Sequence, residues 1–264
     1  MKKYSILITS LLFSFGVFAQ SNTDTITSNR LHFAYGQVYN LKIDKTYSRL
    51  AKNGFNHFID LGYHKINSNR IIDINGSFMI GTLKTKGNTV NIINDYAGNI
   101  QFRYLKNIQK LSKNNLSVYI GGNLGFRGDI WFPKGSELRY GWDINLGTGL
   151  ATSIIYKINS KFSMQYDLDV PLIGVLWRSH NNGQQLVTEE IQLEKGLLAS
   201  SFETPRFSHL FNTLYLDNSV KLIYNVSNKI ALYYNLGLSY KYIKEPLVKK
   251  GYEINNSLGI TFKF

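Results

Sequence analysis

The sequence contains no cysteine, and after residue 20 it has no long uninterrupted apolar run. Without a thiol, the chain can form neither a disulfide nor a thiolate–metal site, and it cannot carry a lipid-modified N-terminal cysteine. Because polar residues interrupt every later apolar stretch, no segment is a candidate for a transmembrane helix. These absences exclude a helical membrane protein, a lipoprotein and a disulfide-stabilised fold.

Residues 1–19 have the features of a secretory signal peptide. Lys2 and Lys3 form the positive region, residues 6–18 form an apolar core too short to span a bilayer, and Ala19 ends a small-residue cleavage site. Cleavage after Ala19 would leave Gln20 first. We therefore expect an exported protein.

The chain is strongly basic, with a formal net charge of +13, or +11 once Lys2 and Lys3 are removed with the signal peptide. A basic surface can meet nucleic acid or anionic lipid headgroups. For an exported chain the second partner is favoured, so we expect no nucleic-acid binding.

Period-two alternation is the main structural signal, and it is clearest over residues 252–264. There, apolar and polar side chains alternate, which predicts a strand with one apolar and one polar face. The pattern predicts about ten strands, near residues 30–40, 54–66, 72–80, 96–104, 116–126, 140–156, 162–170, 214–224, 230–242 and 252–264.

The connections alternate in length as well. Short connections are expected at 67–69, 159–160 and 226–228, with a somewhat longer one at 107–115. Long connections are expected at 41–53, 83–93, 128–138, 172–208 and 244–251. An even number of strands with short turns on one side and long loops on the other is typical of an outer-membrane barrel with periplasmic termini.

Aromatic residues fall at both expected ends of these strands, as in the two girdles that flank the apolar band of a lipid-spanning barrel. The expected periplasmic set is Tyr63, Tyr104, Tyr156, Phe162, Tyr224 and Phe264, and the outer set is Phe78, Tyr96, Phe126, Trp142, Tyr240 and Tyr252. The mean hydropathy of −0.17 agrees, because barrel strands expose only alternate residues to lipid.

The sequence thus predicts an all-β fold, a transmembrane antiparallel up-and-down β-barrel of about ten strands. Its expected organisation is a flexible periplasmic lead over residues 20–29, a barrel over 30–264 and a large external loop over 172–208. A hairpin within 185–202 would raise the count to twelve if it crossed the membrane. Its alternation is weak and Glu190 would disturb it, so an external hairpin that binds a partner or plugs the mouth is favoured.

The last eight residues carry a family resemblance. Ser257, Gly259, Phe262 and Phe264 match every constrained position of the C-terminal assembly signal of bacterial outer-membrane proteins, which this ending resembles. The resemblance implies insertion into a Gram-negative outer membrane by the barrel-assembly machinery. It also implies contact with outer-membrane lipid and lipopolysaccharide, and we expect a monomer.

If the apolar faces meet lipid, the polar faces line a lumen. The expected lumen-lining charges are Asp60, His64, Asp73, Arg103, Arg127, Arg139, Asp143, Asp167, Asp169, Asp217, Lys221, Lys241 and Glu253. Charges shielded from water must be paired, and about ten strands leave an interior that side chains nearly fill. We therefore favour a filled or narrow lumen over a porin-like, small-solute channel.

One constellation suggests catalysis. Asp167, Asp169 and His209 are expected to point inward on neighbouring strands near the outer rim, where carboxylates and a histidine could activate water. This arrangement is similar to that of the omptins, ten-stranded outer-membrane proteases, and would imply hydrolysis of peptides or lipid at the cell surface. The likeness is partial, because no Asp-x-His occurs here. The alternative is that the aspartates pair with luminal arginines and His209 is an ordinary loop-edge residue.

Other catalytic signatures are missing. Neither a Gly-x-Ser-x-Gly elbow nor a His-Glu-x-x-His motif occurs. Gly147-Thr148-Gly149 lacks the third glycine of a dinucleotide loop, so it is interpreted as a device for barrel curvature. Asp60 and His64 are interpreted as a charge pair. We expect no cofactor, no metal and a non-catalytic role, with the rim hydrolase as the alternative.

Overall fold

The computed structural model describes residues 28–45, 48–85, 88–113, 115–134, 141–178, 205–244 and 248–264. The expected signal peptide lies outside these residues, as do Arg139 and most of the expected external loop. Within the described residues, no helix has the length and apolar character needed to cross a membrane.

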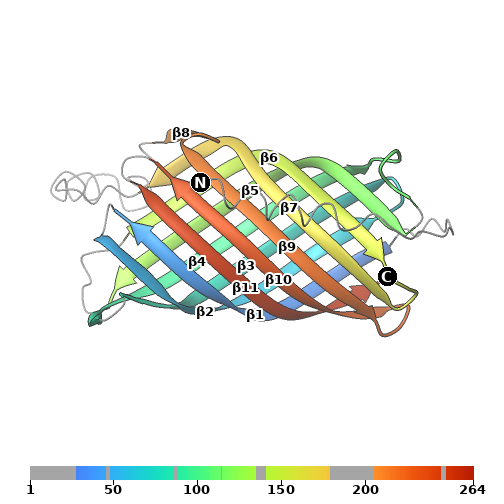
Figure 1. The fold of residues 1–264 in the computed structure, drawn as a ribbon, viewed down its shortest axis with the longest axis horizontal. Coiled ribbons are helices and arrows are strands. Elements are labelled where there is room, and N and C mark those ends of the chain that lie inside the picture. Colours follow the sequence, from blue (N-terminus) through green and yellow to red (C-terminus); the bar gives the residue numbers. More distant parts are fainter. Residues whose placement is uncertain are drawn as a thin grey trace, which may run out of the picture.

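One antiparallel sheet contains every strand of the described residues (Figure 1). Its strands are β1 (Ser28–Asp44), β2 (Ser48–Ile66), β3 (Arg70–Thr85), β4 (Asn88–Asn107), β5 (Leu116–Pro133), β6 (Gly141–Lys157), β7 (Phe162–Arg178), β8 (Arg206–His209), β9 (Thr213–Asn225), β10 (Ile230–Ile243) and β11 (Lys249–Lys263).

The sheet closes on itself. Neighbours in sequence pair antiparallel, β1 pairs with β11 from Arg30↔Lys263 to Asp44↔Lys249, and β6 pairs with β7. The strands β8 and β9 both pair with β7 and are separated only by residues 210–212, so together they form one interrupted barrel strand. The fold is therefore a closed barrel of ten strands, as predicted, and the twelve-strand alternative is wrong.

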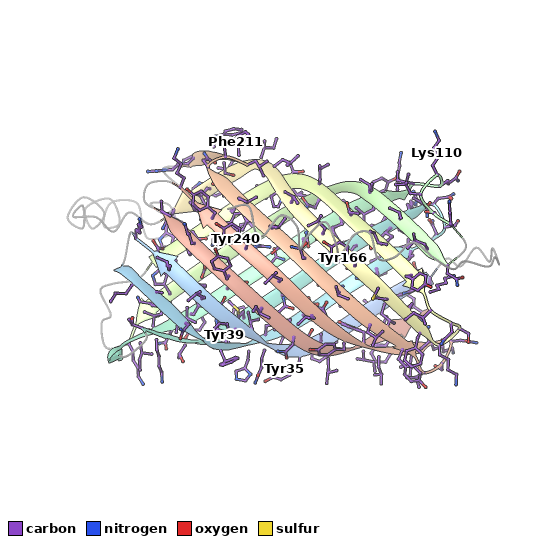
Figure 2. The ribbon with its side chains drawn as sticks, in the orientation of Figure 1. Tyr35, Tyr39, Lys110, Tyr166, Phe211 and Tyr240 are labelled. Carbon is purple, nitrogen blue, oxygen red and sulfur yellow. The ribbon has the colours of Figure 1, made fainter. Side chains whose placement is uncertain are left out.

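The barrel is apolar on its outer surface and polar inside. Along β1, Leu31, Phe33 and Tyr35 are exposed on the outer surface, whereas the intervening His32 and Ala34 are buried inside. Tyr35 and Phe211 stand away from the barrel wall in Figure 2. A soluble barrel would bury its apolar face, so this inverted arrangement is that of a barrel whose wall contacts lipid.

The strands extend further on the outer side than the alternation predicted. β3 continues seven residues past Phe78 to Thr85, and β5 continues seven past Phe126 to Pro133. The long connections expected at 41–53 and 83–93 are therefore largely strand, and β5 includes residues 128–133 of the one expected at 128–138. Only residues 249–251 of the connection expected at 244–251 are strand, and β7 continues through the expected start of the 172–208 loop. Membrane-spanning strands need only about 9–11 residues, so the barrel wall rises beyond the outer aromatic residues. The expected lead is also shorter, because Ser28 and Asn29 belong to β1.

A β-bulge interrupts the pairing of β6 with β7. The register shifts between Thr148 and Gly149, opposite Pro171, which has no N–H to donate. A Cβ on Gly149 would lie 2.1 Å from the carbonyl oxygen of Val170, so only glycine allows this close approach of the two strands. The predicted role of Gly147–Gly149 in shaping the barrel agrees with this geometry.

Candidate functional site: the charged lumen

The predicted lumen-lining residues surround one cavity of about 220 Å³ in the described part of the barrel. Those on its wall are Asp60, His64, Asp73, Arg103, Arg127, Asp167, Asp169, Asp217, Lys221, Lys241 and Glu253. Asp143 is buried beside it, and Arg139 lies outside the described residues. In the structure, the described members of this set all face the lumen.

Arg103 on β4 is the centre of a first charged cluster, the inner cluster, whose members are Asp73, Arg103, Asp167, Asp169 and Lys221. Its guanidinium donates to Asp73 on β3, and its Nη1 lies 3.3 Å from Asp167 and 3.4 Å from Asp169 on β7. The Nζ of Lys221 lies 3.6 Å from Asp167. Because β3 and β4 lie across the lumen from β7, one arginine connects two sides of the barrel.

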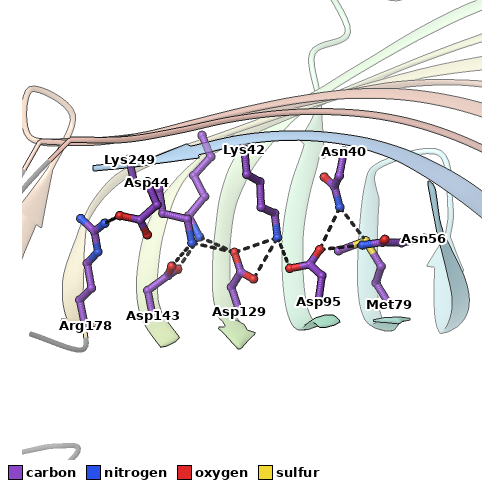
Figure 3. A network of polar contacts seen from close by, with 11 residues as sticks. Asn40, Lys42, Asp44, Asn56, Met79, Asp95, Asp129, Asp143, Arg178 and Lys249 are labelled. Carbon is purple, nitrogen blue, oxygen red and sulfur yellow. Dashed lines mark hydrogen bonds and ion pairs between the residues drawn. The ribbon is translucent and has the colours of Figure 1, made fainter. Parts of the chain in front are cut away.

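A second network joins three lysines and three aspartates, on strand segments nearer the outer end. Figure 3 shows most of its contacts. The lysines come from β1, β10 and β11, which meet where the barrel closes, and the aspartates come from β4, β5 and β6 on the facing wall. We call this set the lysine–aspartate network; its members are Lys42, Lys241, Lys249, Asp95, Asp129 and Asp143.

Asp129 has the most partners in the lysine–aspartate network. Its carboxylate accepts from the Nζ of Lys42 at 3.0 Å, of Lys241 at 3.3 Å and of Lys249 at 2.9 Å. Lys241 and Lys249 also both bind Asp143, which is the cross-strand neighbour of Asp129. The three lysines thus neutralise carboxylates that would otherwise repel each other across adjacent strands.

The remaining contacts complete the lysine–aspartate network. The Nζ of Lys42 lies 2.7 Å from Asp95, which also accepts from Asn56 at 2.6 Å. The Nζ of Lys249 lies 4.2 Å from the centre of the Trp131 ring, a cation–π distance. All six charged side chains are buried, so the network has the pairing that buried charges require.

Four members of this network were not predicted. The expected loops included Lys42, Asp129 and Lys249. The strand expected at 96–104 began one residue after Asp95. The signal was present: Asp129 follows Arg127 by two residues and so has the same parity, and Asp95 precedes the aromatic Tyr96. Extending each alternation past the outer aromatic residues would have found them.

Further ion pairs cross the lumen outside these two clusters. Arg127 on β5 lies 2.5 Å from Asp217 on β9, and this pair is partly exposed to the cavity. Tyr215, fully enclosed, lies beside it, with the Arg127 guanidinium 5.0 Å from the ring centre. Nearer the mouth, Arg178 lies 2.5 Å from Asp44, joining β7 to β1.

The end of the lumen that carries the 67–69 turn, which is expected to be periplasmic, is apolar where β2 to β6 meet. Ile66, Ile71, Leu105, Tyr119 and Ala151 pack together inside the barrel, beside the 67–69 turn. The hydroxyl of Tyr119 donates to the carbonyl of Asn67 at 3.2 Å. Apolar side chains therefore fill this side of the interior at that level.

The predicted catalytic constellation is not assembled. Asp167 and Asp169 face the lumen, but His209 pairs with the exposed Ile173 and therefore lies on the outer face. Its ring lies 5.9 Å from that of Phe207 and 6.1 Å from that of Phe211, between two strongly exposed phenylalanines. The expectation that all three side chains point inward is wrong, because the bulge near Pro171 reverses the parity of β7 between Asp169 and Ile173.

His64 also has a structural setting. Its Nε2 lies 3.1 Å from Asp73, and its ring lies 4.8 Å from that of His32, which is 3.5 Å from Asp60. The predicted pairing of His64 is therefore with Asp73 and not with Asp60. Over the described ranges, no group of three or more histidine and acidic side chains is arranged to hold a metal ion.

The residues of the assembly signal divide between the two faces of β11. Phe262 and Phe264 are exposed on the outer surface, and Ser257 is buried inside. Gly259 faces inward under Tyr233, since a Cβ there would lie 2.3 Å from the tyrosine ring. Glycine at this position therefore lets the ring of Tyr233 lie against the strand.

Comparisons with known proteins identify the fold. No known family model matches the sequence, and no curated protein matches it. The crystal structure of the outer-membrane protease OmpT from Escherichia coli is similar, with 8% sequence identity, a TM-score of 0.57 and coverage of 92% of this chain and 99% of that chain.

Two other outer-membrane proteins also match, at lower TM-scores. The Neisserial surface protein A is 13% identical, with a TM-score of 0.38 and coverage of 89% of this chain and 97% of its own. The translocator domain of the autotransporter NalP from Neisseria meningitidis is 8% identical, with a TM-score of 0.43 and coverage of 98% and 93%. The similarity to the OmpT barrel, the apolar exterior and the charged lumen identify the chain as a bacterial outer-membrane β-barrel.

Proposed function

We propose that this protein is a non-catalytic outer-membrane barrel with an occluded lumen, which serves as a structural and surface-binding component of the membrane. The observation that supports this proposal is that the lumen is crossed by ion pairs at several levels. Arg103 connects β4 to β7, and the lysine–aspartate network connects β1, β10 and β11 to β4, β5 and β6.

These cross-lumen contacts argue against a channel. A conducting pore needs a continuous wet path, and porins with open channels use about sixteen strands or more. Here each arginine and lysine of the two clusters is bound to carboxylates on another strand, and the cavity between them holds only about 220 Å³. Opening a path would mean separating buried charges, which is costly.

The outer face supplies the proposed binding surfaces. The apolar band contacts outer-membrane lipid, and the basic balance of the chain favours the phosphates of lipopolysaccharide. External loops are the usual binding surface of a barrel, so residues between β7 and β8 are the proposed site for a partner. Gly259, Phe262 and Phe264 are the proposed contacts for the barrel-assembly machinery.

The purified barrel should show no steady ion conductance in a planar lipid bilayer. The reason is that ion pairs cross the lumen at two levels and an apolar cluster fills part of one end, so an aqueous path among the described residues would have to separate buried charges. The measurement is single-channel recording with a porin of known conductance as the positive control. Stable, reproducible openings of the wild-type protein would contradict the occluded lumen and favour a small-solute channel.

A rim hydrolase remains the second candidate function, because the fold is shared with a protein described as an outer-membrane protease. Its residues would be Asp167 and Asp169, which lie side by side in the lumen. Against it, both carboxylates are already within 3.4 Å of Arg103, and His209 lies on the opposite face of the wall.

No cleavage of peptides or of lipopolysaccharide is therefore expected from the purified protein. The measurement is product release over hours, with Asp169→Asn as the matched variant. If the wild type cleaves and Asp169→Asn does not, the result would support the hydrolase and contradict the non-catalytic proposal. Cleavage that survives in the variant would point to a contaminant.

A further inference from the structure

The cavity in the lumen has an acidic wall in an otherwise basic protein. Seven carboxylates and four cationic side chains line it, so its net charge is −3 with histidine neutral, whereas the whole chain carries +13. All four cations are engaged. Arg103, Lys221, Arg127 and Lys241 each have an aspartate within 3.6 Å.

Two carboxylates of this wall are left without a cationic partner of their own. Glu253, on β11, makes no hydrogen bond or ion pair with any described residue, and it faces Asn40 and Ser239 on the neighbouring strands. The cations that act on it, Lys42, Arg127 and Lys241, are bound to aspartates. Asp60, on β2, has only His32 at 3.5 Å, and its second oxygen has no partner.

Neutral acceptors on the same wall are also unsatisfied. The side-chain oxygens of Asn75, Asn235 and Asn255 have no hydrogen-bond partner among the described residues. Buried acceptors without donors are costly, and cations are the strongest donors to carboxylates. The unpartnered oxygens on the cavity wall are therefore best satisfied by hydrogen-bond donors that carry positive charge.

We propose that this cavity binds a small organic cation through its ammonium groups, with Glu253 as the main anionic contact and Asp60 and Asn255 as further acceptors. The cavity suits a ligand smaller than a drug-sized molecule, because pockets for drug-sized ligands hold roughly 300–1,000 Å³ and this one holds about 220 Å³. A metal ion is disfavoured, because within the described ranges no group of three acidic or histidine side chains is arranged to hold one. The site goes beyond the proposed structural role and does not depend on it.

The test is equilibrium binding of putrescine, a four-carbon diamine, to the detergent-solubilised protein by titration calorimetry. The protein and diamine are equilibrated for hours, because the lysine–aspartate network covers the outer end of the cavity. The wild type should bind putrescine saturably, and Glu253→Gln should weaken binding about tenfold or more, as expected for loss of a charge-assisted hydrogen bond. The neutral diol of the same chain length should not bind.

Two further variants make the result decisive. Ser68→Lys adds the same unit of positive charge at an exposed periplasmic turn and should bind putrescine as the wild type does. Asn255→Asp adds a carboxylate to the cavity wall and should tighten binding, which keeps the proposal testable if Glu253→Gln does not fold. The proposal would be overturned by any of four results: no binding by the wild type, equal affinity in Glu253→Gln, unchanged affinity in Asn255→Asp, or equal binding of the diol. Each would mean that water alone fills the cavity. None of these outcomes bears on the conductance measurement.

Discussion

Asp129→Asn should lower the free energy of unfolding by about 3–5 kcal/mol, the usual cost of removing one member of a buried ion-pair cluster. The carboxylate of Asp129 binds Lys42, Lys241 and Lys249, and all four side chains are buried. Asparagine keeps the size of the side chain, so the loss comes from three lysines left with too little negative charge. The measurement is urea unfolding of the barrel refolded in lipid vesicles, followed by tryptophan fluorescence.

The matched control is Asp217→Asn. This is the same substitution in the same lumen, but in the described part of the chain Asp217 has a single cationic partner, Arg127. The two side chains are partly exposed, Asp217 at 23% and Arg127 at 28%. Because solvent screens this pair in part, the free-energy cost of Asp217→Asn should be close to the roughly 0–1 kcal/mol that is typical of exposed pairs. If the two substitutions cost the same, the lysine–aspartate network is not what joins the two walls of the barrel.

Leu236→Arg should destabilise the barrel by about 2–4 kcal/mol, the cost of a cation on the lipid face near the middle of the membrane. Leu236 lies in the middle of β10 and is 48% exposed on the outer surface, between Val220 and Asn256 on the adjacent strands. The same vesicle unfolding assay measures the effect. The destabilisation should be smaller in detergent micelles, where the guanidinium of the introduced arginine reaches water more easily.

Asn235→Arg is the control for the assigned faces. Asn235 is the preceding residue on the same strand, and its side chain lines the acidic cavity, where free carboxylate capacity exists. An arginine there gains negative neighbours without meeting lipid, so its cost should be clearly smaller. Equal losses in the two variants would contradict the inside–outside assignment of β10.

The existence and the faces of the ten strands could be predicted because both are local properties. A strand alternates its side chains with a period of two whatever lies beside it, so residues such as Arg103, Lys241 and Glu253 were assigned inward correctly. The strand ends could not be read in the same way. Lys42 and Asp129 continue the alternation, but a polar residue beyond the aromatic girdle has the same appearance in a strand and in a loop.

Parity itself failed at one place, and the reason is also physical. The position of His209 depends on its pairing with Ile173, and a bulge at Gly149 and Pro171 reverses the faces just before that point. A bulge inserts one residue into one strand only, so it changes the register between two strands that are far apart in sequence. Proline and paired glycines hint at such an irregularity without specifying its direction.

The amino-acid sequence by itself determined that this chain is a barrel with an oily exterior and an ionic interior, since that follows from alternation within each strand. Only the tertiary structure decided which charges meet: Lys42 reaches Asp95 and Asp129 because closure of the sheet sets β1 opposite β4 and β5. The same closure left Glu253 without a hydrogen-bond or ion-pair partner among the residues that the structure describes. Contacts across an enclosed space depend on strand number, tilt and register together, and none of these is a property of any one segment.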